Sequence, residues 1–325
     1  YFVMFDLTAL MIVCNGAERI AKAINSIAWV TKQIIVIDTG SVDNSPVIAS
    51  QLGAEVHFFE WQNDFALARN YGLQFARYPW ILIIDSDEEL NQQSLVENFN
   101  LTSDPKVGGL RVQIVNHVER GNSYTKTHHT YTRIFRNHPA IRFEAPIHEQ
   151  IAQSILDAGF QIVDTNITID HYGYSSINID KINRNRELLE NALKDNPDDH
   201  WTIFHLAETE FAIGNIDKAR LLYEKILDSF LLNPEQTEMV RIRLAQIALK
   251  TDKYAQVYEY LPNPCTDKHR EGLRLMIIAT ALLMEQRFAE AEEVFNRQEI
   301  QLSDMVDKTQ IQKAIELINF LSKRG

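Results

Sequence analysis

Short apolar runs alternate with helical stretches in the first half of the chain. Four runs predict strands: LMIV, QIIVIDTGS, AEVHFFEW and WILIIDSDE, which begin at residues 10, 33, 54 and 80. The first two have the short length and β-branched content of buried strands. Between them, ERIAKAINSIAWV, residues 45–52 and DFALARNYGLQFAR carry apolar positions at helical spacing. Strands that alternate with helices predict βαβ units, and therefore a parallel sheet with helices on both faces.

The second half follows a different pattern, helical almost without interruption from about Ile177. The pair Leu206 and Ala207 recurs at 244–245, and an alanine recurs at 279. A second small or apolar position recurs at 219, 257 and 291, and both series step by 38 and then by 34. A period near 34 predicts tetratricopeptide-type helix pairs with a degenerate middle unit. An irregular helical bundle is the alternative.

Composition agrees with two folded domains, an α/β domain over residues 1–176 and an all-α repeat domain over 177–325. The chain has 325 residues, of which 45% are hydrophobic and 23% charged, and nine of its 12 glycines precede residue 176. This content excludes disorder, and no run reaches the roughly 18 apolar residues of a membrane-spanning helix.

The two cysteines, Cys14 and Cys265, cannot form a disulfide framework, which predicts a reducing, cytoplasmic location. A net charge of −12 argues against broad nucleic-acid binding.

The predicted strands end in polar residues. Ligands bind at the carboxyl ends of strands in such sheets, and Asn15, Asp38 and the pair Asp85 and Asp87 lie there. Two carboxylates one residue apart suit a divalent cation that is shared with phosphate oxygens. One alternative is a solvated turn that continues into two glutamates. Another is a phosphatase nucleophile, which the position of the pair on about the fourth strand disfavours.

Asp38 has the position from which a carboxylate accepts hydrogen bonds from a nucleoside. A dinucleotide-binding dehydrogenase is disfavoured, because the first turn reads NGAERI and lacks the G-x-G-x-x-G motif. Capping of the following helix is the alternative role for Asp38.

Several ordered segments match one family. MIVCNGAERI, IIVIDTGSVDNS, FEWQNDFALARNYG and WILIIDSDEEL resemble family 2 glycosyltransferases of the nucleotide-sugar-dependent GT-A type. With RIFRNHPAIRFEAPIHEQI and DHYGY, the chain is similar over about residues 8–300 to a bacterial subgroup that carries tetratricopeptide repeats and includes a peptide S-glycosyltransferase. The resemblance implies a GT-A (Rossmann-like, mostly parallel) domain followed by TPR-like repeats. It also implies inverting transfer from a UDP-sugar to a peptide, protein or other acceptor.

The resemblance assigns the nucleotide contacts. The loop around Val13 and Asn15, together with Asp38, would hold the uridine. Arg69 would contact the nucleotide base or stabilise the pocket. Relatives usually carry larger side chains where this sequence has Cys14 and Gly16. The loop is therefore expected to act through its backbone.

The resemblance also assigns a metal site. Asp85 and Asp87, with Ser86 between them, would bind Mn²⁺ or Mg²⁺, and the cation would grip the diphosphate of the donor. His171 in DHYGY would be a late ligand to the same cation, as a neutral imidazole whose other ring nitrogen is held by a neighbour. A histidine satisfied between the domains is the alternative.

An inverting transfer needs a base near the acceptor, and the resemblance implies one in FEAPIHEQ. Glu149 is favoured, followed by His148 and Glu144, because each can take a hydroxyl or thiol proton. The alternative for Glu149 is to cap the following helix. Arg133 and Arg136 could bind the diphosphate or an anionic acceptor, although exposed arginines on strands are common.

Three hypotheses follow for the whole protein. The first is a cytoplasmic transferase whose repeats present a concave surface to a peptide or protein. The second is a transferase acting on a cell-envelope or lipid-linked glycan. The third is a binding scaffold with an inactive domain, which the intact pair of aspartates disfavours. A homodimer formed through the repeats is compatible with the sequence.

Overall fold

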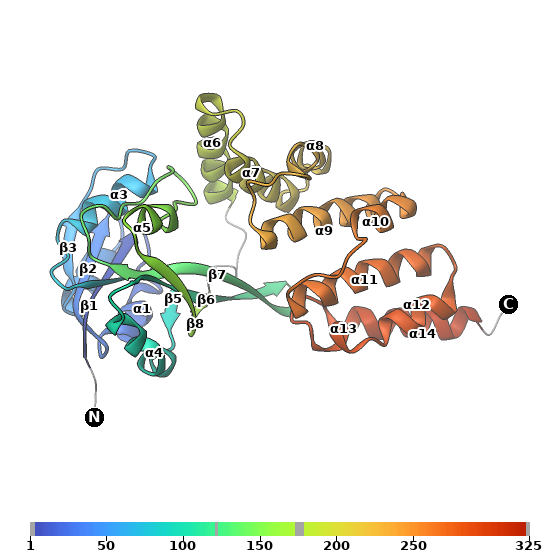
Figure 1. Ribbon diagram of the computed structural model, residues 1–325, viewed down its shortest axis with the longest axis horizontal. Coiled ribbons are helices and arrows are strands. Elements are labelled where there is room, and N and C mark those ends of the chain that lie inside the picture. The colour runs from blue at the N-terminus through green and yellow to red at the C-terminus, as the bar shows by residue number, and fades with distance from the viewer. Residues whose placement is uncertain (1–3, 121–122, 173–178, 323–325) are drawn as a thin grey trace. The chain divides into compact units, whose positions relative to one another are not determined.

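The computed structural model describes residues 4–120, 123–172 and 179–322, and it divides into two compact units (Figure 1). The first unit comprises residues 1–119 and 126–177, and the second comprises 120–125 and 178–325. The predicted domain boundary after residue 176 lies outside the described residues.

The first unit is built on an eight-stranded sheet in the order β3-β2-β1-β4-β7-β6-β8-β5. β1 pairs in parallel with β2 and β4, β2 with β3, and β6 with β8, whereas β7 and β5 run antiparallel to β4 and β8. This mostly parallel sheet confirms the predicted GT-A type of α/β fold. The strands are β1 Phe5–Val13, β2 Thr31–Asp38, β3 Glu55–Phe58, β4 Trp80–Ile83, β5 Glu88–Leu90, β6 Val107–Arg120, β7 Ser123–Arg136 and β8 Gln161–His171.

Helices cover both faces of this sheet (Figure 1). Alternate residues of β1 point to opposite faces, so Leu7 and Met11 join a core with helix α1, and Leu10 joins a second core with helix α3. Gly72 of α3 lets the helix lie close to the sheet, because a Cβ there would come within 2.4 Å of a Leu10 methyl. The helices of this unit are α1 Ile20–Ile27, α2 Ser45–Gln51, α3 Phe65–Leu73, α4 Gln92–Asn98 and α5 Ala152–Asp157, with a 3-10 helix at Phe99–Ser103.

The expected single strand WILIIDSDE is two strands. β4 ends at Ile83 in the middle of the sheet. β5 forms an edge of the sheet, where it pairs with β8, and β7, β6 and β8 lie between β4 and β5. The Glu88 N–H donates to the Asp85 carbonyl at 3.1 Å, which closes the turn between the two strands. The acidic pair therefore lies in a turn that joins distant parts of the sheet.

The second unit consists of helices in antiparallel pairs (Figure 1). The recurring positions predicted from the sequence are all buried, which confirms helix pairs α7/α8, α9/α10 and α11/α12. The helices are α6 Ile179–Asp195, α7 His200–Ala212, α8 Ile216–Ile226, α9 Pro234–Lys250, α10 Tyr254–Tyr260, α11 Lys268–Met284, α12 Phe288–Phe295, α13 Gln298–Leu302 and α14 Lys308–Ser322.

The repeat has a more regular length than the sequence series indicates. Asp199, Asn233 and Asp267 cap the first helix of each pair with their side chains, and the interval between successive caps is the same both times. The longer first step of the sequence series arises inside the helix pairs. α9 has 17 residues where α7 has 13, and α10 has 7 where α8 has 11. Compared with the pair α7/α8, the pair α9/α10 thus has about one more turn in its first helix and about one turn less in its second.

The turn inside each pair has the same backbone form. Gly214, Asp252 and Gln286 all have positive φ, at 88°, 56° and 63°, and the next helix begins two residues later in each case. Only glycine adopts this conformation without steric cost. The pair α7/α8, which has the glycine, therefore matches the tetratricopeptide sequence pattern better than the pairs α9/α10 and α11/α12.

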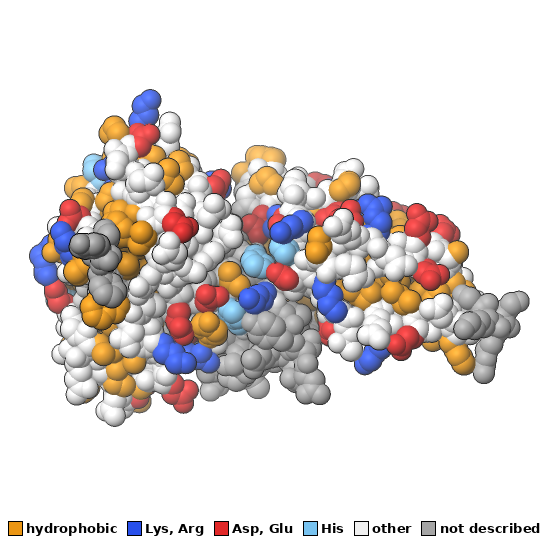
Figure 2. Space-filling view, turned by 90° about the horizontal axis from the view of Figure 1, so that it is seen from below, with side chains coloured by type: hydrophobic (Ala, Val, Ile, Leu, Met, Phe, Trp, Pro, Cys, Tyr) orange, Lys and Arg blue, Asp and Glu red, His pale blue; other side chains and the backbone are white. Residues whose placement is uncertain are grey.

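No described helix is long and apolar enough to cross a membrane. On the face drawn in Figure 2, acidic and basic side chains of the described residues are interspersed, so no field of a single sign covers that face.

Candidate active site

The loops after β1 and β2 are tied together. The backbone N–H groups of Asn15, Gly16 and Ala17 donate to side-chain oxygens of the second loop at 2.9, 2.8 and 3.0 Å. In return, the Asn15 side chain accepts from the Val42 N–H at 2.9 Å, with Asn15 at a φ of 57°. The acceptors in the second loop are Ser41, Ser45 and Asp43. Asn15 therefore fixes the shape of the predicted uridine loop.

The first loop also lies against the acidic turn. A Cβ at Gly16 would come within 2.8 Å of the Val13 side chain and 3.0 Å of Ser86 Oγ. The Val13 carbonyl accepts both the N–H and the hydroxyl of Thr39, at 3.0 and 3.2 Å. Gly16 is thus the residue that allows the predicted uridine loop to approach Ser86 closely.

Asp38 is a buried carboxylate with one unused oxygen. Its Oδ1 accepts the N–H groups of Gly40 and Ser41 at 3.0 and 2.9 Å, whereas Oδ2 is buried and has no hydrogen-bond partner among the described residues. An unpaired buried oxygen is costly, so a ligand N–H or O–H at this position would be stabilised. The alternative of a helix cap is wrong, because Asn44 occupies the N-cap position of α2.

Asp85 is held by two arginines. Arg69 Nη2 donates to Oδ1 at 2.9 Å, and Arg133 Nη2 lies 3.3 Å from Oδ2. Burial raises the pKa of Asp85, but the charges of Arg133 and Arg69 outweigh it and hold this pKa well below the usual range. The side chain is 34% exposed, so an ionised carboxylate remains open to a ligand.

Arg69 lies between the predicted metal carboxylate and the predicted base. It is 4% exposed, and its Nε donates to Glu149 while its Nη2 donates to Asp85. Its third nitrogen, Nη1, is buried and has no hydrogen-bond partner among the described residues. The guanidinium also lies 5.7 Å from the centre of the Phe143 ring. The guanidinium of Arg69 therefore links Glu149 to Asp85.

Asp87 and His171 meet across the neighbouring strands. His171 Nε2 lies 3.4 Å from Asp87 Oδ2, and its Nδ1 lies 2.7 Å from Asn116 Oδ1. Burial lowers the pKa of His171, but the hydrogen bond and charge of Asp87, with the charges of Glu88 and Asp85, outweigh this effect and raise it. An imidazole held at one nitrogen is oriented as metal-ligating histidines are. The last two residues of DHYGY lie outside the described residues.

The loop of residues 144–150 presents the candidate bases. Its ends are joined by backbone hydrogen bonds between Glu144 and Gln150, and His148 has a φ of 53°. The Glu149 side chain is 14% exposed and faces Arg69, whereas Glu144 is exposed. Burial lowers the pKa of His148 to about 4, although the charge of Glu149 opposes it. The alternative role of Glu149 as a helix cap is wrong, because α5 is preceded by Ile151 without a side-chain cap.

Residues 8–167 match the sequence profile described as Glycosyl transferase family 2. This domain belongs to glycosyltransferase family 2.

Two curated proteins are similar to a larger part of this chain than the family 2 domain alone. A TPR repeat-containing protein of Synechococcus elongatus is 33% identical over 226 residues, which cover 67% of this chain and 55% of the relative. The glycosyltransferase SunS of Bacillus subtilis, derived from the SPbeta prophage, is 24% identical over 264 residues, 78% of this chain and 61% of SunS. This chain thus spans only 55% to 61% of the length of these relatives.

Among solved structures, S. aureus TarS in complex with UDP-GlcNAc aligns over 88% of this chain and 92% of that chain. The TM-score is 0.43 and the sequence identity 16%. Glucosyl-3-phosphoglycerate synthase of Mycobacterium tuberculosis, in complex with Mn²⁺, UDP and glucosyl-3-phosphoglycerate, aligns over 58% of this chain and 78% of that chain. There the TM-score is 0.40 and the identity 16%.

The glycosyltransferase domain contains a site residue that the sequence reasoning missed. The sequence assigns Glu88 no role beyond the alternative of a solvated turn, but the residue is 1% exposed and accepts from Arg133 Nη2 at 2.8 Å. Period-two alternation from Leu90, which is 5% exposed, was the available signal, since it places Glu88 on the same buried face.

The two arginines of RIFRN have different surroundings in the glycosyltransferase domain. Arg133 contacts Asp85 and Glu88 within the candidate site. Arg136 donates instead to the carbonyls of Val107 and Asp104 and lies over the Trp80 ring at 4.8 Å. Arg136 therefore braces the ends of strands, and Arg133 is the arginine of this pair that belongs to the site.

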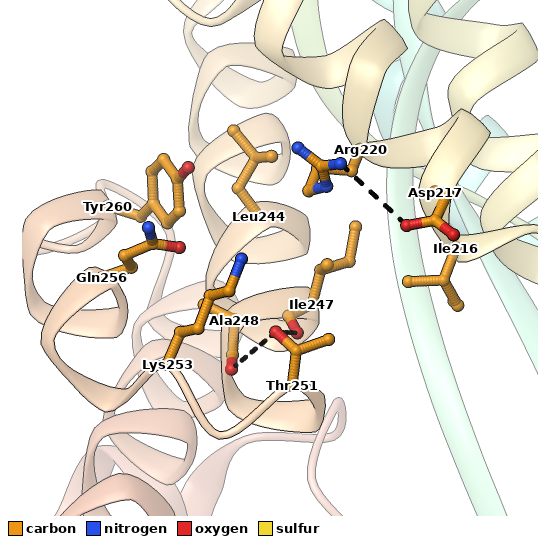
Figure 3. Close-up of a pocket in the computed structure, with 10 residues that line it drawn as sticks. All are labelled: Ile216, Asp217, Arg220, Leu244, Ile247, Ala248, Thr251, Lys253, Gln256 and Tyr260. Carbon is orange, nitrogen blue, oxygen red and sulfur yellow. Dashed lines mark hydrogen bonds and ion pairs between the residues drawn. The ribbon is translucent and has the colours of Figure 1, made fainter.

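A cavity of about 90 Å³ lies elsewhere, between α8, α9 and α10 of the repeat unit. Figure 3 shows Leu244, Ile247 and Ala248 on one wall, with the charged ends of Arg220 and Lys253 beside them. Small-molecule sites usually enclose about 300–1,000 Å³. This cavity is therefore too small for a ligand of nucleotide-sugar size.

Proposed function

We propose that this chain is a metal-dependent, inverting glycosyltransferase that moves a sugar from a UDP-sugar to a peptide or protein. The observation that carries the proposal is the convergence of three groups within a family 2 domain. These are the carboxylates of the acidic turn, His171 with its Asn116 partner, and the linked pair Arg69 and Glu149.

The donor is held at the carboxyl ends of β1, β2 and β4. The unused oxygen of Asp38 accepts a nucleoside N–H or O–H, and the loop around Val13 and Asn15 lines the same site. Asp85 and Asp87 would hold Mn²⁺ or Mg²⁺ through carboxylate oxygens, which such ions prefer, and His171 would add one imidazole nitrogen. When bound, the cation supplies stabilisation of the negative charge that grows on the leaving diphosphate.

The protein's own part in the reaction is to remove one proton from the acceptor. Glu149 takes it from the acceptor hydroxyl or thiol, whose electron pair forms the new bond to the anomeric carbon. The bond from that carbon to the diphosphate oxygen breaks, and its electrons leave with the diphosphate. Attack opposite the leaving group inverts the anomeric carbon. Arg69 holds the Glu149 carboxylate in place, and His148 is the second candidate because a pKa of about 4 leaves it neutral but weakly basic.

The repeat domain supplies the acceptor surface in this proposal. Stacked helix pairs offer extended grooves, which suit an elongated polypeptide better than a free sugar. The cavity between α8, α9 and α10 is large enough for one side chain of such an acceptor. A cell-envelope or lipid-linked glycan is the second candidate acceptor. A homodimer and a cytoplasmic location stay predictions.

The test is calorimetric titration of the full chain with UDP and with several UDP-sugars, each with and without Mn²⁺. We expect UDP binding that Mn²⁺ strengthens, and we expect Asp87→Ala to lose the Mn²⁺ effect while keeping its fold. Slow hydrolysis of one UDP-sugar would name the donor. Absence of UDP binding under every condition would refute the donor assignment, and binding without any turnover would favour the inactive scaffold.

A further inference from the structure

Glu88 is a buried acid that the proposed chemistry does not use. It begins the edge strand β5, directly opposite His171 in the ladder with β8, and it is 1% exposed. Burial of a carboxylate is costly unless hydrogen bonds and charges compensate for it. Burial and the charge of Asp85 raise the pKa of Glu88, while Arg133 opposes this rise. Such a residue needs a structural or functional reason to be an acid.

Both oxygens of Glu88 are directed at the acidic turn. Oε2 accepts the backbone N–H of Asp85 at 2.9 Å, and Oε1 accepts Arg133 Nη2 at 2.8 Å. The backbone N–H of Glu88 returns a bond to the Asp85 carbonyl at 3.1 Å. Glu88 therefore fixes the main chain of the turn directly, and it holds the arginine that faces the Asp85 side chain.

Arg133 passes this constraint to the Asp85 carboxylate. The same Nη2 atom that contacts Glu88 lies 3.3 Å from Asp85 Oδ2, while Arg69 binds Oδ1 from the other side. The side chain of Arg133 is 15% exposed, which leaves it little freedom to turn toward another ligand. Each oxygen of Asp85 thus has its own guanidinium before any ligand arrives.

We propose that Glu88 is a positioning residue, which orients Asp85 for the donor and its cation through Arg133 and through the backbone of the turn. Glu88 does not touch the cation itself in this arrangement. The inference rests on the proposed function, since it assumes that Asp85 meets a cation and a UDP-sugar. It also assigns Arg133 to the support of Asp85 and not to direct binding of the diphosphate.

The test measures Mn²⁺ binding to the full chain by the electron paramagnetic resonance signal of free Mn²⁺, with and without UDP. Glu88→Gln keeps the size of the side chain and removes its charge. Loss of a group that orients a ligating side chain typically weakens metal binding about 10- to 100-fold, and we expect this loss here. Glu89→Gln, the next residue on the same strand, is the matched control and should stay within about twofold of the wild type.

Arg133→Lys provides a second variant that keeps the positive charge but replaces the planar, rigid guanidinium with a shorter and more flexible ammonium, which does not hold the two carboxylates in one fixed geometry. It should weaken Mn²⁺ binding as Glu88→Gln does, and the double variant should lose much less than the product of the two effects, because both remove one link. Circular dichroism melting checks that each variant is folded.

The outcomes separate the two proposals. If the wild type binds neither Mn²⁺ nor UDP, the proposed function fails. If the wild type binds both and Glu88→Gln binds Mn²⁺ equally well, the positioning role is overturned. A loss of metal-free UDP binding in Arg133→Lys, but not in Glu88→Gln, would also overturn it, because Arg133 would then contact the diphosphate directly.

Discussion

Arg69 joins two side chains that lie far apart in the sequence. Asp85 is 16 residues away and Glu149 is 80 residues away, yet one guanidinium binds both. The position of Asp85 and Asp87 at the end of β4 was predictable, because a local motif follows an apolar strand. The link to Glu149 was not, since it depends on Asn70 of α3 holding the backbone of Phe143 at the start of a distant loop. Long-range pairing of this kind leaves no local pattern.

Replacement of Glu149 by Gln tests the base. The amide keeps a hydrogen-bond acceptor for Arg69 but cannot take a proton. We expect UDP affinity to stay within about twofold, and turnover of the UDP-sugar to fall about 10²- to 10⁴-fold, as for loss of a general base. Rates of sugar release measured by chromatography give the result.

Two variants of the same loop serve as controls for that measurement. Glu144→Gln changes an exposed glutamate and should leave turnover nearly unchanged. His148→Gln should cost less than Glu149→Gln, because burial makes His148 a weak base. Near-normal turnover in Glu149→Gln would transfer the role to His148.

Elements differed in how well the sequence predicted them. The buried strands β1, β2 and β4 and the helix pairs were predictable because the apolar pattern is strong there, and β1 merely begins earlier, at Phe5. β3 forms where the sequence predicts a strand, but it is only partly buried. β5 was not separated from β4, since it has only three residues and its partner β8 comes much later in the chain. That partner determines which face of the strand is buried, and therefore that Glu88 is inside.

The turns of the repeat offer a stability test. Gln286 is exposed, has a φ of 63°, and its side chain makes no hydrogen bond among the described residues. Gln286→Gly removes the steric cost of this backbone form, at the expense of more freedom in the unfolded chain. We expect a net gain of about 0.5–1 kcal/mol in the free energy of unfolding, measured in urea.

A glycine in a helix supplies the opposite control. Glu293 is exposed in the interior of α12, and Glu293→Gly should lose about 1 kcal/mol. Gly214→Ala, at a φ of 88° with no atom close to the new Cβ, should also destabilise through the backbone alone. A loss in Gln286→Gly comparable to that in Glu293→Gly would show that the positive φ carries no strain.

The whole molecule contains separate hydrophobic cores in its two units. Two clusters lie on the faces of the sheet, and two others lie among the repeat helices. We therefore expect two transitions when the full chain is heated in a calorimeter. Mn²⁺ with UDP at about 100 times its dissociation constant should stabilise one transition by about 2.7 kcal/mol and leave the other in place.

Asp87→Ala provides the comparison for this experiment. In this variant, addition of Mn²⁺ and UDP should shift neither of the two transitions relative to the other. A single transition that moves as a whole in the wild type would contradict the expectation that the units unfold independently.

The constant interval between helix caps has a consequence for rebuilding this protein. Asp199, Asn233 and Asp267 are evenly spaced along the chain even though the turns between paired helices are not. A segment cut from cap to cap keeps both of its helices whole, whereas a cut at Leu244, where the buried pair recurs, divides α9. The caps are therefore the natural junctions for exchanging repeats as cassettes, and each cassette brings its own division of turns between the two helices.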